Sequence, residues 1–249
     1  MSMVNAKYSA LGAATFGCSF WKAKLTQYVV RNRILLALRP AARDFIAARS
    51  LVRPMVAGEV IYEEGAYAVF PHTGLISPMA TMANGKSVEK TSVGHEGFLG
   101  FGLIIGGSGA FGRCVVQVPG YASWLSKVDL DEALEEFQCV RETMLRYAKS
   151  LITQLMETVA CNSLHSAEQR SIRWLLTAHD SVVGNRFNLT QQVIAEVLGL
   201  RRATVSAVCS ELLSEGLIEY TRGDITIVNR SGLESKACEC FHKIRKASM

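Results

Sequence analysis

The stretch that most constrains this chain of 249 residues is LTQQVIAEVLGLRRATVSAVCSELLSEGLI, which runs from Leu189 to Ile218. Apolar or small residues recur there at helical spacing on both sides of a lone Gly199. A glycine between two helical runs allows a left-handed turn that residues with a Cβ resist. The pattern predicts a helix-turn-helix in which Val205 and Val208 hold the second helix against the first. An ordinary helical hairpin is the alternative interpretation.

The exposed face of the predicted second helix carries polar side chains suited to nucleic acid. Arg202, Thr204, Ser206 and Ser210 lie on or beside that face. They supply hydrogen-bond donors and acceptors of the kind that reach base edges and phosphates.

Composition indicates a globular chain rather than a disordered or fibrous one, because 49% of its residues are hydrophobic and 20% are charged. Its length allows two domains, each with its own core. The formal net charge is +5, and the positive charge gathers in residues 1–53 rather than around the helix-turn-helix. A nucleic-acid footprint there must come from the arrangement of side chains, not from bulk charge.

The seven cysteines are scattered without a short repeat, which favours a reducing, cytoplasmic compartment over a disulfide framework. The apolar stretch Ala10 to Trp21 is interrupted by glycine and serine and lacks a clean cleavage site, so we do not interpret it as an export signal. No run is long enough to span a membrane.

Three different sequence patterns follow one another along the first half of the chain. Residues 1–30 lack periodicity and are interpreted as a loosely ordered arm. Residues 31–50 resume helical spacing. From Leu51 onward, short runs rich in β-branched and aromatic residues alternate with glycines, which indicates a small β-barrel or sandwich. Asn84-Gly85 is the best hairpin signal, because both residues tolerate positive φ. The apolar side expected of the 31–50 helix consists of Ile34, Leu35, Leu38, Ala41 and Phe45.

Glycine disappears between Asp129 and Gly184, which indicates a helical region. One apolar seam in it suits a long helix that packs against a partner in a dimer or, equally, against its own β domain. Ser171 to His179 gives a shorter helix. After the helix-turn-helix, two strands around Thr221 to Asp224 read as a two-stranded wing. The seam consists of Val140, Met144, Tyr147, Leu151, Leu155 and Val159.

A β-rich domain, a long helix and a winged helix-turn-helix, in this order, resemble the Crp/Fnr family of bacterial transcription regulators. The match covers about Arg31 to the carboxyl terminus and is strongest over Leu189 to Ile218; VGHEGFLG, SIRWLLTAHD and SGLESKACECF also resemble a proteobacterial branch. The resemblance implies an α+β fold with a cyclic-nucleotide-binding-like jelly roll, or double-stranded β-helix. It divides the chain into an arm (1–30), a sensor domain (31–130), a dimerisation helix (131–162) and a DNA-binding domain (163–249).

The resemblance also implies a cytoplasmic homodimer that binds a pseudo-palindromic DNA operator, with RNA polymerase as a further partner and no membrane association. It implies no enzyme activity. The alternative function is a signal-binding module whose winged helix docks on a protein or an RNA.

The base-reading positions are carried over one at a time. Arg202 keeps the arginine that would bind guanine, Ala203 replaces an acid, and Ala207 replaces a second arginine. The operator sequence is therefore expected to differ from that of the cyclic-AMP receptor. Thr190 is expected to cap the first helix and direct its amino terminus at a phosphate. The DNA-binding residues expected in full are Thr190, Gln191, Arg201, Arg202, Thr204, Ser206 and Arg222.

The β domain departs further from the cyclic-nucleotide binders. Phe101 stands where they carry the ribose glutamate, and Cys114 replaces the hydroxyl beside the phosphate arginine, which is Arg113 here. Because a charge-assisted hydrogen bond is lost, cyclic AMP is not expected to bind. Arg113 is the one residue predicted to bind an effector, which would then be another anion. The alternative role for Arg113 is a surface salt bridge.

Four other motifs are interpreted as structural, and no cofactor, metal or catalytic site is predicted. Gly107 to Gly112 fits G-x-G-x-x-G, but a strand follows it rather than a helix. His95-Glu96 lacks the second histidine of a zinc protease. Cys238-x-Cys240-x-His242 would need further ligands from afar to close a zinc site. Cys18 stands alone, without the amino-terminal cluster of the iron–sulphur members.

Overall fold

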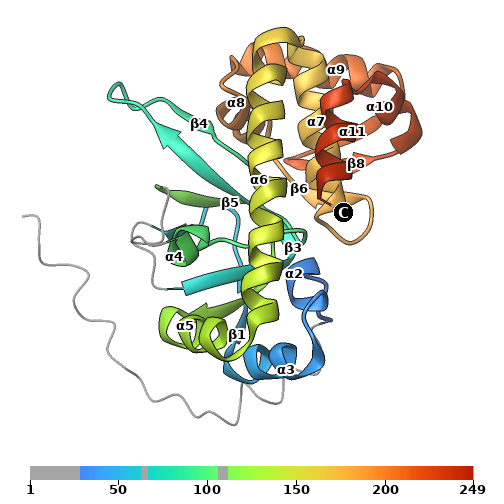
Figure 1. Cartoon of the computed structure of the whole chain (residues 1–249). Coiled ribbons are helices and arrows are strands. Elements are labelled where there is room, and N and C mark those ends of the chain that lie inside the picture. The colour runs from blue at the N-terminus through green and yellow to red at the C-terminus, as the bar shows by residue number, and fades with distance from the viewer. Residues whose placement is uncertain (1–28, 63–66, 106–111, 249) are drawn as a thin grey trace, which may run out of the picture.

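Two long antiparallel strands form the centre of the amino-terminal domain (Figure 1). The structure is a computed structural model that describes residues 29–62, 67–105 and 112–248. Residues 1–28 of the predicted arm lie outside these ranges, as does most of the Gly107 to Gly112 motif. The β-rich half, a long helix and a helical domain follow one another, so the expected α+β fold is confirmed.

The sheet of the β domain has the order β1-β5-β3-β4, and β2 also pairs with β5. β3 and β5 pair from Tyr67 with Ser126 to Pro78 with Cys114, with shifts of register that bend both strands. Apolar residues on both faces are buried, among them Phe70 on one face and Val69 on the other. The strands are β1 (Leu51–Met55), β2 (Val60–Tyr62), β3 (Tyr67–Thr81), β4 (Ser87–Glu89) and β5 (Cys114–Ser126).

The hairpin predicted at Asn84-Gly85 is confirmed as the link from β3 to β4. Gly85 has a φ of 80°, and its amide donates to the carbonyl of Met82 at 2.9 Å. The left-handed backbone that glycine adopts readily is what closes this turn.

The single helix predicted over 31–50 is wrong, because Pro40 divides it. Proline lacks an amide hydrogen and is favoured in the first turn of a helix, so a second helix begins there. α2 (Arg33–Leu36) and α3 (Pro40–Arg49) result. The buried side consists of Ile34, Leu35, Leu38, Ala42 and Ile46, whereas Ala41 is exposed and Phe45 is half-buried.

The stretch 131–162 contains the end of α5 (Lys127–Glu136) and most of α6 (Gln138–Leu164), which meet at Phe137. The first half of the predicted seam packs on its own β domain, since Val140, Met144 and Tyr147 are buried with Phe70 and Phe98. α6 then continues to the helical domain (Figure 1). α4 (Phe101–Ile105) lies beside α6.

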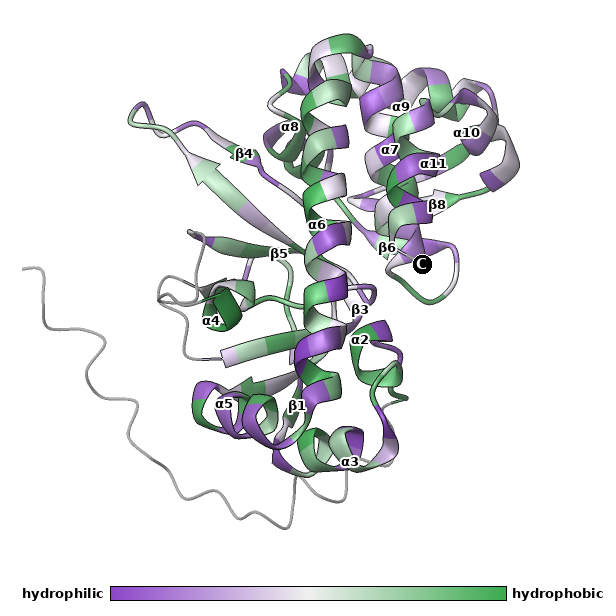
Figure 2. Cartoon of the chain, viewed as in Figure 1, coloured by the Kyte–Doolittle hydropathy of each residue, from purple (hydrophilic) through white to green (hydrophobic). Residues whose placement is uncertain are grey.

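A different apolar stripe on α6 is exposed. Leu145 is 50% exposed, Ile152 56%, Met156 67% and Val159 68%. These residues are spaced by seven, four and three, which is the spacing of a helix–helix seam. Figure 2 shows apolar segments recurring along the length of α6.

The helical domain begins with α7 (Ala167–Asp180), which Ser166 and Gln169 close with a capping box. Its apolar residues share one core with Leu75 and Val118 of the β domain. The remaining elements are β6 (Arg186–Asn188), α8 (Gln191–Leu198), α9 (Arg202–Ser214), β7 (Ile218–Thr221), β8 (Asp224–Ile227), α10 (Arg230–Lys236) and α11 (Glu239–Ala247).

The wing has three strands rather than the two predicted. β6 pairs with β8 through Phe187 and Ile225, which gives the order β6-β8-β7. A strand of three residues between polar loops is too short to show a period of two, so the sequence did not reveal it. None of the helices in the described ranges has both the length and the hydropathy of a membrane span.

Candidate DNA-binding surface and effector cavity

The helix-turn-helix has the geometry that its sequence predicts. The Thr190 hydroxyl accepts from the amide of Val193 and caps α8, and Gly199 ends α8 with a φ of 62°. Ala195 and Val205 are buried where α8 and α9 meet. The turn therefore fixes the direction in which α9 leaves α8.

The outer face of α9 presents most of the predicted base-reading residues. Arg201, at the start of the helix, and Arg202 are exposed, whereas Thr204 and Ser206 are half-buried. Ala203 and Ala207, which replace an acid and an arginine of the family, are also exposed on this helix. The surface therefore carries two guanidinium groups, hydroxyls and methyl groups at one helix end.

The wing turn lies next to the start of α8. The amide of Leu189 donates to the carbonyl of Gly223 at 2.7 Å, and a Cβ at Gly223 would lie 3.5 Å from Thr190 Cγ2. Arg222 is exposed at the tip with a φ of 50°, and Gln191 is half-buried at the first position of α8. The predicted phosphate-contacting residues from α8 and from the wing thus share one edge of the domain.

A cavity of about 370 Å³ lies between the β domain and α6. Phe101 and Cys114, the two positions at which the chain departs from the cyclic-nucleotide binders, both line it. Burial raises the pKa of the Cys114 thiol to about 11, and Lys90 opposes this rise. The other lining residues are predominantly apolar, and Lys90 is the charged side chain among them.

Arg113 is exposed just before β5 and is not among the residues that line this cavity. Successive residues of a strand point to opposite faces, so Cys114 turns inward and Arg113 outward. Its role in effector binding stays a prediction. The cavity residues that sequence reasoning missed are Leu151, Ile152 and Leu155 of α6 and Lys90 beside β4.

Residues 169–236 match the family model of the Crp-like helix-turn-helix domain. Solved regulator structures are similar to this chain over 74–82% of its length. The chain has the domain and the fold of the Crp/Fnr regulators. No curated protein sequence matches it.

Three solved structures show the likeness. A transcriptional regulator of the Crp/Fnr family from Eubacterium rectale is 15% identical with a TM-score of 0.60, over 82% of this chain and 97% of that one. FixK2 from Bradyrhizobium japonicum is 15% identical with a TM-score of 0.61, over 76% and 98%. TTHB099, a regulator of the CRP family from Thermus thermophilus, is 19% identical with a TM-score of 0.60, over 74% and 96%. At these identities the likeness shows the fold.

The Crp-like domain contacts the β3–β4 hairpin directly. Trp174 Nε1 of α7 lies 3.1 Å and 3.2 Å from the two carboxylate oxygens of Glu89 at the end of β4. Ser77 and Ser92 also donate to this carboxylate. Burial raises the pKa of Glu89, and these hydrogen bonds oppose the rise. A Cβ on Gly199, in the turn between α8 and α9, would lie 3.4 Å from Val88.

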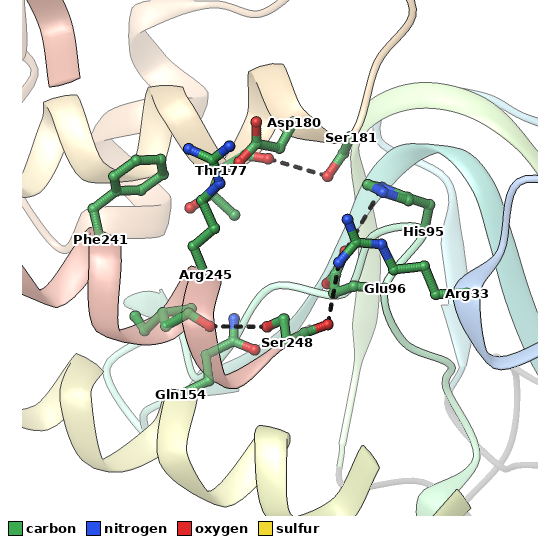
Figure 3. Close-up of a pocket in the computed structure, with 11 residues that line it drawn as sticks. Arg33, His95, Glu96, Gln154, Thr177, Asp180, Ser181, Phe241, Arg245 and Ser248 are labelled. Atoms are coloured by element: carbon green, nitrogen blue, oxygen red, sulfur yellow. Dashed lines mark hydrogen bonds and ion pairs between the residues drawn. The ribbon is translucent and has the colours of Figure 1, made fainter. Parts of the chain in front are cut away.

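A second cavity, of about 200 Å³, marks the junction of the two domains (Figure 3). Arg33 Nη1 donates to the carbonyl of Ser248 at 3.2 Å, and the Arg33 amide donates to the carbonyl of His95 at 2.7 Å. Burial lowers the pKa of His95, and Glu96 opposes that shift. Figure 3 shows side chains from α7 and α11 facing His95 and Glu96, so polar groups of both domains meet here.

The sulfur of Cys238 meets that of Cys161 at 3.7 Å where the Crp-like domain joins the end of α6. The Cys240 sulfur lies 3.7 Å from His165 Nδ1. All three thiols are buried, whereas His242 is exposed. Cys161 of α6 and His165, which directly follows that helix, are thus two further potential ligands that the local spacing of Cys238 and Cys240 could not show. The expectation that Cys238 and Cys240 are ordinary residues of a terminal helix stays a prediction.

Proposed function

We propose that the protein is a homodimeric, sequence-specific DNA-binding transcription regulator controlled by a small molecule in the cavity beneath α6. The proposal assigns 31–130 to the sensor, 131–162 to dimerisation and 163–249 to DNA binding. The exposed end of α9 with Arg202 is the observation that carries it. The Crp-like domain and the fold support it.

The contribution of each DNA-facing residue follows from its chemistry. Arg202 offers the planar fork that binds guanine in two hydrogen bonds, and exposed Ala203 and Ala207 offer methyl groups suited to thymine. Arg201, Thr204 and Ser206 supply further donors along α9. Thr190, Gln191 and Arg222 form the phosphate-contacting edge, where the amino terminus of α8 adds its positive dipole end.

Dimerisation is inferred from the apolar stripe on α6. A continuous row of Leu145, Ile152, Met156 and Val159 open to solvent is costly, and pairing with the same row of a second copy would bury it. A two-fold dimer presents two α9 helices, which fits an inverted repeat with half-sites about 34 Å apart.

The effector is inferred to be a small, largely apolar molecule. The cavity beneath α6 has Phe101 where a ribose-binding carboxylate would stand, and three α6 residues complete it. Burial of apolar area, rather than charge-assisted hydrogen bonds, would then supply the affinity.

A route from the cavity to the DNA-binding domain follows the chain. Lys90 and Thr91, which line the cavity, directly follow Glu89, which contacts Trp174 of α7. Val88, on the same strand, lies against the turn between α8 and α9. A ligand in the cavity that displaces this segment would disturb both the Glu89–Trp174 contact and the Val88 contact. The segment would then link the cavity to the DNA-binding domain.

The test is selection of bound duplexes from a random DNA pool with the full chain. An inverted repeat is expected to be enriched. Arg202→Ala should weaken binding to it by about 5–150-fold, since a bidentate arginine–guanine pair contributes about 1–3 kcal/mol of discrimination. Arg39→Ala, an exposed arginine of the β domain, serves as the matched control and should bind as the wild type does.

No enriched repeat, or equal enrichment by Arg202→Ala, would contradict the proposal. Enrichment of RNA hairpins or a protein partner through the same face would favour a docking module instead.

A further inference from the structure

Four side chains that no other part of the account uses converge at the junction of α6 with the carboxyl-terminal helices. Cys161 lies in the last turn of α6 and His165 directly follows that helix, whereas Cys238 and Cys240 stand at the start of α11. Their ligand atoms all lie within 4.8 Å of one another. Cys161 and Cys238 are 77 residues apart in the sequence.

Two of the distances between these atoms match the edges of a zinc tetrahedron. Zinc binds cysteine sulfur at about 2.3 Å and histidine nitrogen at about 2.0–2.1 Å, which sets sulfur–sulfur edges of about 3.8 Å and sulfur–nitrogen edges of about 3.6 Å. The distances from Cys161 to Cys238 and from Cys240 to His165 are both 3.7 Å. Three cysteines and one histidine form a closed donor set of the structural type.

We propose that Cys161, His165, Cys238 and Cys240 bind one zinc ion that ties the Crp-like domain to the end of α6. Binding forms three zinc–sulfur bonds and one bond to His165 Nδ1. The three thiols release their three protons to solvent, and no electrons are transferred. The product, zinc with three thiolates and a neutral imidazole, carries one net negative charge.

The surroundings of the cluster suit that product. His165 Nε2 lies 3.3 Å from the Glu239 carboxylate, which is the outer contact that orients zinc-bound histidines. Arg170 interacts electrostatically with Cys161, and its buried Nε has no hydrogen-bond partner among the described residues. Its positive charge compensates the site. Cys238 occupies the N-cap position of α11, although its side chain makes no cap hydrogen bond, and the helix dipole there favours a thiolate.

The site lies at the connection between α6 and α7, on which the orientation of the Crp-like domain depends. α6 ends at Leu164 and α7 begins at Ala167, so His165 and Ser166 connect the two helices. Arg170 Nη2 also donates to the carbonyl of Leu198, at the end of α8, at 2.5 Å. A zinc ion here would limit movement of the Crp-like domain about that connection.

The experiment measures metal in the full chain purified without a histidine tag. Elemental analysis should give about one zinc per chain after zinc loading and dialysis. Calorimetry in buffers of different ionisation enthalpy should report about three protons released per zinc. Cobalt in place of zinc should give the visible bands of a tetrahedral ion and a thiolate-to-cobalt charge-transfer band.

Variants assign the ligands. Cys240→Ser should lose the metal and the charge-transfer band, and Cys139→Ser, a half-buried cysteine of α6 outside the cluster, should keep both. His165→Cys, with four thiolates, should keep the metal and intensify the charge-transfer band, which guards against a variant that merely fails to fold.

Three results would overturn the proposal. They are a wild-type chain with no bound zinc after loading, a cobalt spectrum lacking thiolate charge transfer, and a Cys161–Cys238 disulfide in the freshly purified protein. None of these results bears on selection of an inverted DNA repeat, so the two proposals fail separately.

Discussion

The recognition surface of α9 and the cavity beneath α6 are both suited to a partner, and they are built in opposite ways. The recognition surface comes from one continuous segment and exposes polar groups. The cavity is assembled from β3, β5, α4, α6 and the segment after β4, and it is largely apolar. This difference underlies the proposal that the recognition surface binds a large charged polymer and that the cavity binds a small apolar molecule. The hairpin at Glu89 lies between them.

The largest expected effect comes from disrupting the dimer on which operator binding is proposed to depend. Met156→Glu with Val159→Glu places two charges in the exposed stripe of α6, where burial of unpaired charge is costly. We expect monomers in analytical ultracentrifugation and a fall in operator affinity of about 100-fold or more, since half-sites would bind singly.

Val128→Glu is the control for that pair, because Val128 is 76% exposed on α5 and is not part of the α6 stripe. It should leave both the assembly and the affinity unchanged. Dimers that persist with both charges in the stripe would place the interface elsewhere.

The next prediction tests whether the cavity and the recognition surface bind independently of each other. Leu151→Trp should fill part of the cavity and weaken binding of the uncharged fluorophore N-phenyl-1-naphthylamine by about tenfold, or about 1.4 kcal/mol. Arg202→Ala should leave fluorophore binding unchanged. Fluorescence titration measures both, and equal losses in the two variants would break the distinction between the surfaces.

Acid should lower the free energy of unfolding of the β domain, which contains His72, by about 1 kcal/mol, and this sensitivity should distinguish it from the helical domain. Burial lowers the pKa of His72 to about 4 from an ordinary value of 6.5. Between these two pH values the unfolded chain binds a proton at His72, whereas the folded β domain does not. Stability should therefore be intact above pH 6.5 and be lost as pH falls toward 4, by about 1 kcal/mol at pH 5.5.

His72 accepts hydrogen bonds from the amides of Arg31 and Asn32 and contacts Ser123. His72→Gln keeps polar partners for them without titrating, and it should flatten this part of the denaturation profile measured at several pH values. A wild-type profile already flat from pH 7 to pH 5 would contradict the assignment.

The smallest effect concerns the wing. Arg222→Ala should weaken DNA binding about threefold at all sequences and reduce the slope of log affinity against log salt by about one. Because φ at residue 222 is 50°, Arg222→Asn is the companion variant that tolerates this backbone while removing the charge. A change in sequence preference would show that Arg222 reads bases.

The same comparison explains what the sequence could predict. The capped helix at Thr190, the turn at Gly199 and the packing of Val205 depend on neighbours within a few residues, so local spacing was sufficient. The cavity and the cysteine cluster were not predictable in this way, because Cys161 and Cys238 meet through the packing of α11 on α6. The two substitutions Phe101 and Cys114 were visible in the sequence, but that both line one cavity was not.

Corrections to the helices have equally local causes. The first helix ends at Leu36 and Pro40 begins the next, although the apolar spacing runs through both. On α6, Val140 and Met144 turn toward the β domain, while Val159 of the same predicted seam remains exposed. A single seam drawn through all of them joined two faces of the helix, and only the position of the β domain separates them.

Two copies of the chain are proposed to bind one DNA duplex. Native mass spectrometry of the full chain with the selected duplex measures this stoichiometry directly. Two chains per duplex are predicted, with binding lost when about half a helical turn of DNA is inserted between the half-sites and regained after a full turn. One chain per duplex, or binding indifferent to that spacing, would contradict it.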